Sequence, residues 1–167
     1  MRSYKDLNMN YKGGPLSIGH DMVYNLDGCP QHITGHFDCD YDNLTSLVGG
    51  PQKVDGNYDC RYNLLTDLVG CASHIGGELN FYSNNITSLV GIHKIIKSCE
   101  SIEFKGTQIE VGGIGLLLIK NLTCLKWNMY EIEPITIIGS YLGQGTKGMM
   151  ECSKELTAKG YEEYAKL

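Results

Sequence analysis

Hydrophobic residues recur at an interval of 21 residues over much of the chain, and polar residues fill the positions between them. The interval is clearest in three consecutive segments that begin at Leu26, Leu47 and Leu68, namely LDGCPQHITGHFDCDYDNLTS, LVGGPQKVDGNYDCRYNLLTD and LVGCASHIGGELNFYSNNITS. A fourth segment opens with LVGIHKII at Leu89, and KGGPLSIGHDMVYN before Leu26 fits the same phase. A fixed period of this length predicts a repeat architecture in which each turn packs against its neighbours.

Each repeat contains one short stretch with the alternation of a β-strand. In the second repeat the apolar positions are Val54, Tyr58, Cys60, Leu65 and Leu68, and the spacing of Tyr58 and Cys60 is that of a strand with one buried face. Glycine and proline surround this stretch and leave no room for a full helix. The pattern therefore predicts one strand per repeat, stacked in register at ~4.8 Å into a parallel sheet.

The interval becomes slightly longer after Leu89, although the alternation continues. The positions that carry it further are Ile102, Phe104, Thr107, Ile109, Leu125, Trp127, Tyr130 and Ile132. We therefore predict a β-rich solenoid of about five to six turns with a parallel sheet.

One polar position recurs within the apolar pattern, at Asp42, Asn63 and Asn84. Asn and Asp side chains hydrogen-bond nearby backbone groups, so a stacked column of them would satisfy N–H and C=O groups at a buried corner. Cys39 and Cys60 lie three residues earlier, where we interpret them as small hydrophobic core residues rather than redox groups.

The segments FDCDYDNL, YDCRYNLL and LNFYSNNI, which start at Phe37, Tyr58 and Leu79, resemble the L-x-L-x-x-N-x-L centre of the leucine-rich repeat. The resemblance covers roughly residues 12–132 and recurs in phase. It departs from the family at the leading apolar residue, which lies four positions before the strand pair rather than three, at Ile33, Val54 and Ile75. The repeats are also similar to compact repeats of many bacterial and phage proteins of undefined function. This resemblance implies a recognition scaffold and names no partner.

A solenoid needs a cap at each end. We expect residues 1–11 to form the N-terminal cap, residues 12–133 the leucine-rich-repeat-like solenoid, and residues 134–167 a helical C-terminal cap. Residues 113–121 are expected to form a short helix and residues 139–148 a glycine-rich loop. Residues 149–167 predict an amphipathic helix from the spacing of Met150, Leu156, Tyr161, Tyr164 and Leu167. A partner-binding or dimerising role for this helix is the alternative to a packed cap.

Composition narrows the classes of protein and of partner. The formal net charge of −5 argues against nucleic acid or an anionic membrane as the main partner. The N-terminus lacks the apolar run of a signal peptide, and no run is long enough to span a bilayer. The chain has seven cysteines without CxxC spacing, which favours reduced thiols in the cytoplasm over disulfides or a zinc site.

Motifs for catalysis or cofactor binding are weak. GSYLGQGTKG (139–148) contains glycines and Lys147 but lacks the order of a phosphate-binding loop. His32 and His74 share a phase two turns apart, ~10 Å from each other, too far for joint metal ligation. His20-Asp21 and the scattered serines fit no nucleophile–base arrangement. Calcium is disfavoured because the glycine–aspartate nonapeptide pattern is missing. We therefore expect no cofactor, no metal and no enzymatic activity.

The remaining candidate site is the strand face that points away from the core. Side chains between the buried ones point outward in a strand. The outward set is His36, Asp38, Asp40, Tyr41, Asn57, Asp59, Arg61, Tyr62, Glu78, Asn80, Tyr82 and Glu103, and Lys105 continues it. Five acids against two bases give this set a formal charge of −3, which favours a protein partner with a basic surface. A merely solvated polar face is the competing interpretation.

The sequence thus favours a non-catalytic protein-binding module in the cytoplasm. By analogy with the family, the chain would be a phage or bacterial inhibitor that blocks a host or regulatory protein. If a phage encodes it, it would act in the host cytoplasm. The alternative is a structural or assembly component that oligomerises or docks through its C-terminal segment.

Overall fold

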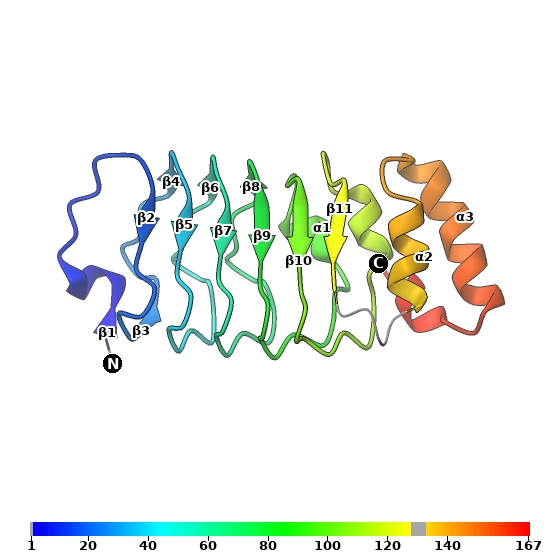
Figure 1. The fold of residues 1–167 in the computed structure, drawn as a ribbon, viewed down its shortest axis with the longest axis horizontal. Helices are drawn as coiled ribbons and strands as arrows, with labels where there is room; N and C mark the ends of the chain where they lie inside the picture. The colour runs from blue at the N-terminus through cyan, green and yellow to red at the C-terminus, as the bar shows by residue number, and fades with distance from the viewer. Residues whose placement is uncertain (1, 128–132) are drawn as a thin grey trace.

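Six short strands form the main parallel sheet of the computed structural model, which describes residues 2–127 and 133–167. Figure 1 shows these strands side by side in a straight row. They are β2 (Leu16–Ser17), β5 (Phe37–Asp38), β7 (Tyr58–Asp59), β9 (Glu78–Asn80), β10 (Ser101–Glu103) and β11 (Cys124–Lys126). Their pairing register runs Leu16, Phe37, Tyr58, Leu79, Ile102 and Leu125. The repeat interval of the sequence, including its lengthening after Leu89, is therefore the strand register of the structure.

A second parallel sheet forms behind the first, where the sequence pattern predicted only a return segment. Its strands are β4 (His32–Ile33), β6 (Lys53–Val54) and β8 (His74–Ile75). Each repeat in this part of the chain therefore contributes two strands rather than one. Beyond β8 the line continues as single bridges, from His74 to Ser98 and from Ser98 to Lys120.

The core lies between the two sheets and follows the predicted apolar columns. Val54, Tyr58, Cys60, Leu65 and Leu68, the predicted core of the second repeat, are all buried. Rings in adjacent turns contact one another, with centroids 5.0 Å apart for Phe37 and Tyr58 and 5.7 Å apart for Phe81 and Phe104. All seven cysteines are free, and six of them are buried. Tyr130 and Ile132, which the pattern placed in the last turn, lie outside the described residues.

The polar corner column binds backbone as predicted. Asn63 accepts at Oδ1 from the N–H of Leu44 at 2.9 Å, and its Nδ2 donates to the carbonyl oxygen of Cys39 in the preceding turn at 2.8 Å. Asn84 repeats both bonds one turn later. Asp42 accepts from the N–H of Val23 at 3.1 Å, but its buried Oδ2 has no hydrogen-bond partner in the described part of the chain. Burial raises the pKa of Asp42 to about 6.

The N-terminal segment covers the first turn. β1 (Arg2–Ser3) pairs in parallel with β3 (Val23–Asn25), and the 3-10 helix η1 (Tyr4–Leu7) follows. Tyr4 is buried and packs with the core, whereas Met9 is 42% exposed.

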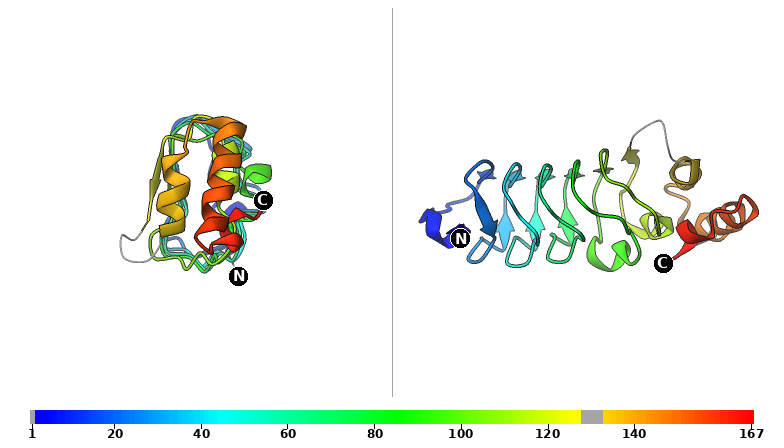
Figure 2. Two further views of the ribbon diagram at one scale, coloured as in Figure 1. Left: turned by 90° about the vertical axis from the view of Figure 1, so that its right-hand side faces the viewer. Right: turned by 90° about the horizontal axis from the view of Figure 1, so that it is seen from below.

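Helices close the other end of the row (Figure 2). They are α2 (Glu133–Ser140), α3 (Gly145–Ala158) and the 3-10 helix η3 (Glu162–Ala165), which follow α1 (Ile92–Ile95) and the 3-10 helix η2 (Ile114–Leu118) of the longer turns. The short helix expected at 113–121 is therefore present as η2. Among the described residues, no helix is both long and apolar enough to cross a membrane.

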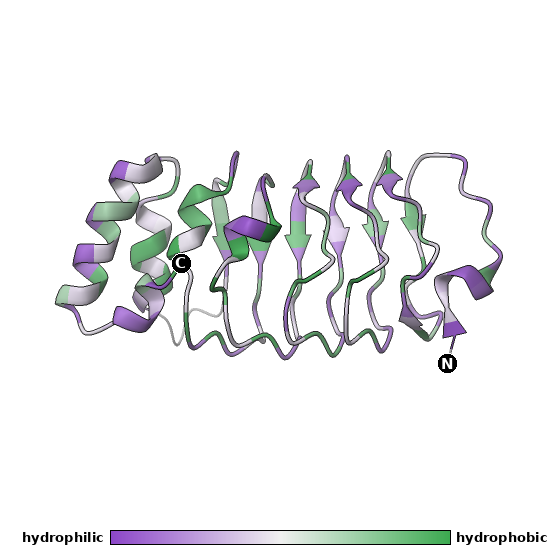
Figure 3. Ribbon diagram, turned by 180° about the vertical axis from the view of Figure 1, so that it is seen from behind, coloured by the Kyte–Doolittle hydropathy of each residue, from purple (hydrophilic) through white to green (hydrophobic). Residues whose placement is uncertain are grey.

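Two expectations for this cap were wrong. The glycine-rich loop predicted at 139–148 is confined to residues 141–144, because Gly139 and Gly148 lie inside helices. The helix predicted at 149–167 starts earlier and ends at Ala158, because Gly160 adopts a left-handed φ of 82° that stops it. Bands of polar and apolar residues alternate along α3 (Figure 3). Leu156 is buried, but Met150, assigned to the apolar side, is 62% exposed.

Candidate functional site

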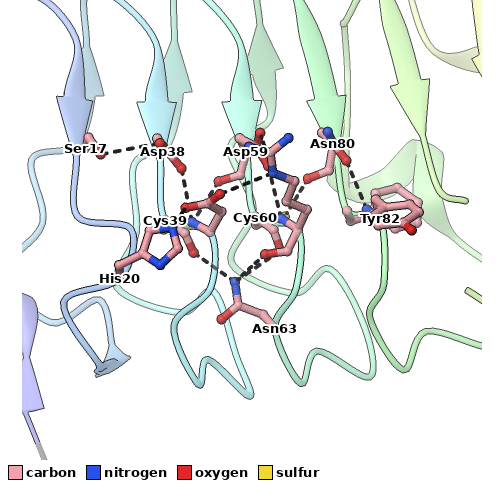
Figure 4. A network of polar contacts seen from close by, with 12 residues as sticks. Ser17, His20, Asp38, Cys39, Asp59, Cys60, Asn63, Asn80 and Tyr82 are labelled. Atoms are coloured by element: carbon pink, nitrogen blue, oxygen red, sulfur yellow. Dashed lines mark hydrogen bonds and ion pairs between the residues drawn. The ribbon is translucent and has the colours of Figure 1, made fainter. Parts of the chain in front are cut away.

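The predicted site residues lie on the outer side of the main sheet, which we call the sheet face. They form rows across the turns because the strands are in register. The first row is His36, Asn57 and Glu78; the second is Asp38, Asp59, Asn80 and Glu103; the third is Asp40, Arg61 and Tyr82. Tyr41 and Tyr62 follow at the corner that ends the strands. Figure 4 shows Asp38, Asp59 and Asn80 of the second row and Tyr82 of the third row from close by.

Much of the second row binds the protein's own backbone. Asp38, Asp59 and Asn80 each accept a hydrogen bond at Oδ1 from the N–H two residues later, at 3.1, 3.1 and 3.0 Å. Asp38 also accepts a bond from the hydroxyl of Ser17 at 3.3 Å. These acids and amides therefore have a structural role besides any role in recognition.

The first row holds neighbouring turns together in a similar way. His36 accepts at Nδ1 from the N–H of Asn57 at 2.8 Å, so this nitrogen carries no proton. Asn57 in turn accepts at Oδ1 from the N–H of Glu78 at 3.0 Å. The row thus joins three turns side chain to backbone.

The sequence pattern predicted that Asp40 is exposed, and this was wrong, because the residue is only 4% exposed. Arg61 covers it and donates from Nε to Oδ2 of Asp40 at 3.2 Å. The same Nε lies 3.5 Å from Oδ2 of Asp59. Desolvation raises the pKa of Asp59 to about 6, and the Arg61 charge acts in the opposite direction. Arg61 therefore pairs with the carboxylates of both Asp40 and Asp59.

The far half of the sheet face contains two separate ion pairs. Glu103 lies 3.2 Å from Lys105, and Lys126 donates to Glu78 across two turns. Lys126 was not among the predicted site residues, although it is the strand partner of Glu103 in the next turn and continues the same row. With Lys126 the face has five acids and three bases, so its formal charge is −2 rather than −3.

An aromatic stack runs along the corner at the end of the strands. Ring centroids are 4.7 Å apart for His20 and Tyr41 and 4.2 Å apart for Tyr41 and Tyr62, with near-parallel planes. Tyr82 closes the stack edge-on against Tyr62 at 5.0 Å. Tyr41 and Tyr62 are 45% and 37% exposed. His20 was not predicted as a member, although the 21-residue interval that links it to Tyr41 was a usable signal.

The backbone beneath this stack is unusual for large side chains. His20, Tyr41 and Tyr62 have φ values of 66°, 50° and 53°, in the left-handed region. Later turns place Ser83 and Gly106 at the same corner. A left-handed conformation costs a residue other than glycine ~1 kcal/mol or more, and a stacked ring pair returns a similar amount.

The tyrosine hydroxyls of the stack are also linked. Hydrogen bonds to the hydroxyls of Tyr82 and Tyr41 raise the pKa of Tyr62, and the bond to Tyr62 lowers the pKa of Tyr82. The rings of His20, Tyr41 and Tyr62 cover each other's faces, so the stack exposes mainly ring edges.

A separate open cavity of about 450 Å³ lies beside the second sheet. Its lining includes Lys53, Asp55, His74 and Glu100. Asp55 binds Lys53 at 2.7 Å and His32 at 2.9 Å, which lowers the pKa of Asp55. In the described part of the chain, no group of three or more His, Cys, Asp or Glu side chains is arranged to hold a metal ion.

Comparison with known proteins gives no relative: no protein-family model, no curated protein and no solved structure matches the chain. The structure itself establishes a mixed α/β chain with parallel sheets of short strands in a repeating register and helices at the C-terminal end.

Proposed function

We propose that the chain is a non-catalytic protein-binding module, built on a leucine-rich-repeat-like solenoid, that recognises its partner through the sheet face and the aromatic stack. The observation that carries the proposal is the corner occupied by Tyr41 and Tyr62. Two half-exposed tyrosines stand in a backbone conformation that favours glycine, at a position where later turns have Ser83 and Gly106. Tyrosine is enriched in interfaces because it buries a large area at low entropic cost.

The partner in this proposal is a cytoplasmic protein, and the resemblance to bacterial and phage repeats favours an inhibitor or modulator of a host protein. An inhibitor of this kind needs no catalytic group, because it acts by covering part of the surface of its target protein. The acidic excess of the sheet face favours a target with a basic patch.

The test is affinity capture from extracts of the native cell, with captured proteins quantified by mass spectrometry. The test variant is Tyr41→Ser/Tyr62→Ser, which uses the residue found at this corner in a later turn. The control is Val48→Ser/Val69→Ser, which removes two side chains exposed by 55% and 53% from successive turns outside the sheet face. We expect a specific partner to be lost from the tyrosine variant and kept by the valine variant. Equal capture by all three proteins would refute the proposal.

A second candidate, assembly through the C-terminal cap, is favoured by one observation. Met150 and Leu167, exposed by 62% and 47%, border a cavity of about 310 Å³ that Ile114 and Met149 also line. If this surface joins copies, light scattering of the full chain will show a dimer or larger species that Met150→Glu/Leu167→Glu converts to a monomer. A monomeric wild type would remove this candidate.

A further inference from the structure

The corner that joins the first turn, residues 16–25, to the second is bonded less completely than the corners that follow it. The N–H of Asn43 lies 3.4 Å from the carbonyl oxygen of Val23, whereas the same backbone bond is 2.9 and 2.8 Å long at the next two corners. Asn63 and Asn84 each add a bond from Nδ2 to a carbonyl oxygen of the preceding turn, at 2.8 and 3.0 Å. Asp42 has an oxygen at that position, and this Oδ2 is buried without a hydrogen-bond partner among the described residues.

A proton on Asp42 would supply the bond that this corner lacks. A carboxylate only accepts hydrogen bonds, whereas a carboxylic acid has one O–H donor. By strand register, the carbonyl group of the preceding turn that corresponds to the acceptor of Asn63 belongs to Ile18. This carbonyl oxygen accepts the N–H of Asp21 at 3.2 Å and has a second lone pair. The protonated acid can therefore donate to Ile18, whereas the ionised acid places a negative charge against the same oxygen.

The surroundings of Asp42 favour the protonated form. Burial raises the pKa of Asp42 to about 6, and the charges of Asp21 and Asp40 add to this rise. Hydrogen bonds from the backbone of Val23 and Met22 act in the opposite direction. Burial and like charge therefore outweigh the two hydrogen bonds at this carboxyl group.

Neighbouring cations do not change this balance. The titratable and charged groups around Asp42 are Asp21, Asp40, Cys39, His20 and Arg61. Nε of Arg61 and Nε2 of His20 lie 3.2 and 3.7 Å from the carboxylate oxygens of Asp40, so they offset the charge of Asp40. Burial raises the pKa of the Cys39 thiol, which therefore keeps its proton.

The segment that contacts Asp42 is strained and partly exposed. His20 and Met22 have φ values of 66° and 56°, in the left-handed region, and Met22 is 60% exposed. This conformation is unfavourable for residues other than glycine, so bonds to the second turn must offset it. One of these is the bond from the N–H of Val23 to Oδ1 of Asp42. A lost bond at this corner therefore acts on a segment of low local stability.

We propose that Asp42 is a proton-controlled latch that closes the first turn onto the second. With its proton, Asp42 donates to the carbonyl oxygen of Ile18 and the turn stays closed. Without the proton, residues 16–25 open locally while the turns from residue 37 onward stay folded. Opening separates His20 from Tyr41, so the aromatic stack loses its first ring. The proposal concerns the free chain and does not depend on the proposed function.

Amide hydrogen exchange, followed by NMR at pH 5 and pH 7.5 and corrected for the intrinsic exchange rate at each pH, tests the latch. We expect the protection of the Ile18 and Val23 amides to fall about tenfold over this interval. Urea below the unfolding transition should leave it unchanged, because local opening exposes little surface. The Leu65 amide, which binds Oδ1 of Asn84, should be better protected and should respond to urea. Equal protection and an equal urea response of Val23 and Leu65 would overturn the proposal, because the whole chain would then open.

Two variants with the same loss of charge separate Asp42 from its surroundings. Asp42→Asn places a permanent donor at the corner, so protection of the Val23 amide should rise about tenfold at pH 7.5 and become independent of pH. Asp21→Asn removes an exposed acid nearby and should keep most of the pH dependence. The proposal is wrong if the tenfold fall persists in Asp42→Asn, or if Asp21→Asn abolishes it as completely.

The carbon-13 shift of the Asp42 carboxyl group identifies the titrating group directly. We expect this shift to titrate with a midpoint near the pKa of about 6, in step with the protection of the first-turn amides. A midpoint at the ordinary value of an aspartate would contradict the latch.

Discussion

The side-chain amide of Asn84 donates to the carbonyl oxygen of Cys60, one turn earlier, at 3.0 Å. The same amide donates to the carbonyl of Phe81 at 3.1 Å, and Oδ1 accepts from the N–H of Leu65 at 3.0 Å. One buried side chain thus satisfies backbone groups of three segments that stacking alone would leave unpaired.

Replacing Asn84 with alanine is expected to reduce the free energy of unfolding by about 2–4 kcal/mol, because buried backbone groups lose their partners. The neighbouring Asn85 is exposed, so Asn85→Ala should cost less than about 0.5 kcal/mol. Urea denaturation of both variants measures the difference. Similar costs for the two variants would show that the corner bonds contribute little.

Replacing Asp42 with asparagine is expected to stabilise the protein at neutral pH. An amide at this position could donate to a carbonyl oxygen of the preceding turn, as Asn63 and Asn84 do, whereas the Oδ2 of Asp42 has no partner among the described residues. The pKa of Asp42 is raised from 3.8 to about 6, so the stability that the protonated acid contributes is present below pH 3.8 and lost as pH rises through about 6.

The gain from Asp42→Asn should therefore be about 1–3 kcal/mol at pH 7 and much smaller at pH 4. Urea denaturation at the two pH values measures it. A gain of equal size at both pH values would contradict a role for the ionised carboxylate.

Replacing Tyr58 with phenylalanine is expected to leave stability unchanged or raise it by about 1 kcal/mol. The Tyr58 hydroxyl is buried without a hydrogen-bond partner in the described structure. Thermal or urea denaturation measures the effect, and a large loss for Tyr58→Phe would reveal a partner for the hydroxyl.

The space around Gly50, beside this hydroxyl, is filled, because a Cβ at Gly50 would lie 2.8 Å from Leu26 Cδ1 and 2.9 Å from the Leu47 carbonyl oxygen. Gly50→Ala should therefore destabilise the protein by about 1–3 kcal/mol in the same assay.

Replacing Arg61 with glutamine is expected to destabilise the protein by about 2–4 kcal/mol at pH 7, because Asp40 is left buried without its cation. The pKa of Asp59, already raised to about 6, would rise further, so protonation removes part of the penalty and the loss should shrink at pH 5. Lys105→Gln breaks a more exposed pair and should cost less than about 1 kcal/mol at either pH. A loss for Arg61→Gln that is independent of pH would argue against the electrostatic explanation.

The columns of the core could be predicted because a strand with one buried face has apolar and polar residues in alternation, and this alternation is visible in the sequence. Tyr58 and Cys60 show this for the strand, and Asn63 shows it for the corner, where the chemistry of the side chain matches the backbone groups it binds. The strands of the second sheet could not be predicted, because two residues such as Lys53 and Val54 are too short to show an alternation.

The candidate site was less predictable than the fold, since exposure depends on which neighbour folds over a residue. Asp40 is outward by alternation, yet Arg61 from the next turn covers it, and nothing in the order of residues encodes that direction. The helix α2 lies within the predicted helical cap but was not predicted as a separate helix, for a different reason. Its β-branched isoleucines have low helix propensity, and packing of Ile135 and Ile138 into the core stabilises it.

The lengthening of the repeat interval where α1 enters divides the row into a part that can be extended and a part that cannot. Before α1, each added copy of a repeat such as residues 47–67 would supply one strand to each sheet, one corner residue and one ring for the stack, all in register. After α1, the second sheet continues only as single bridges. The second strand of a copied turn would therefore have no strand to pair with there. Gene duplication or design could therefore adjust the length of the sheet face from its N-terminal side while the helical end stays constant.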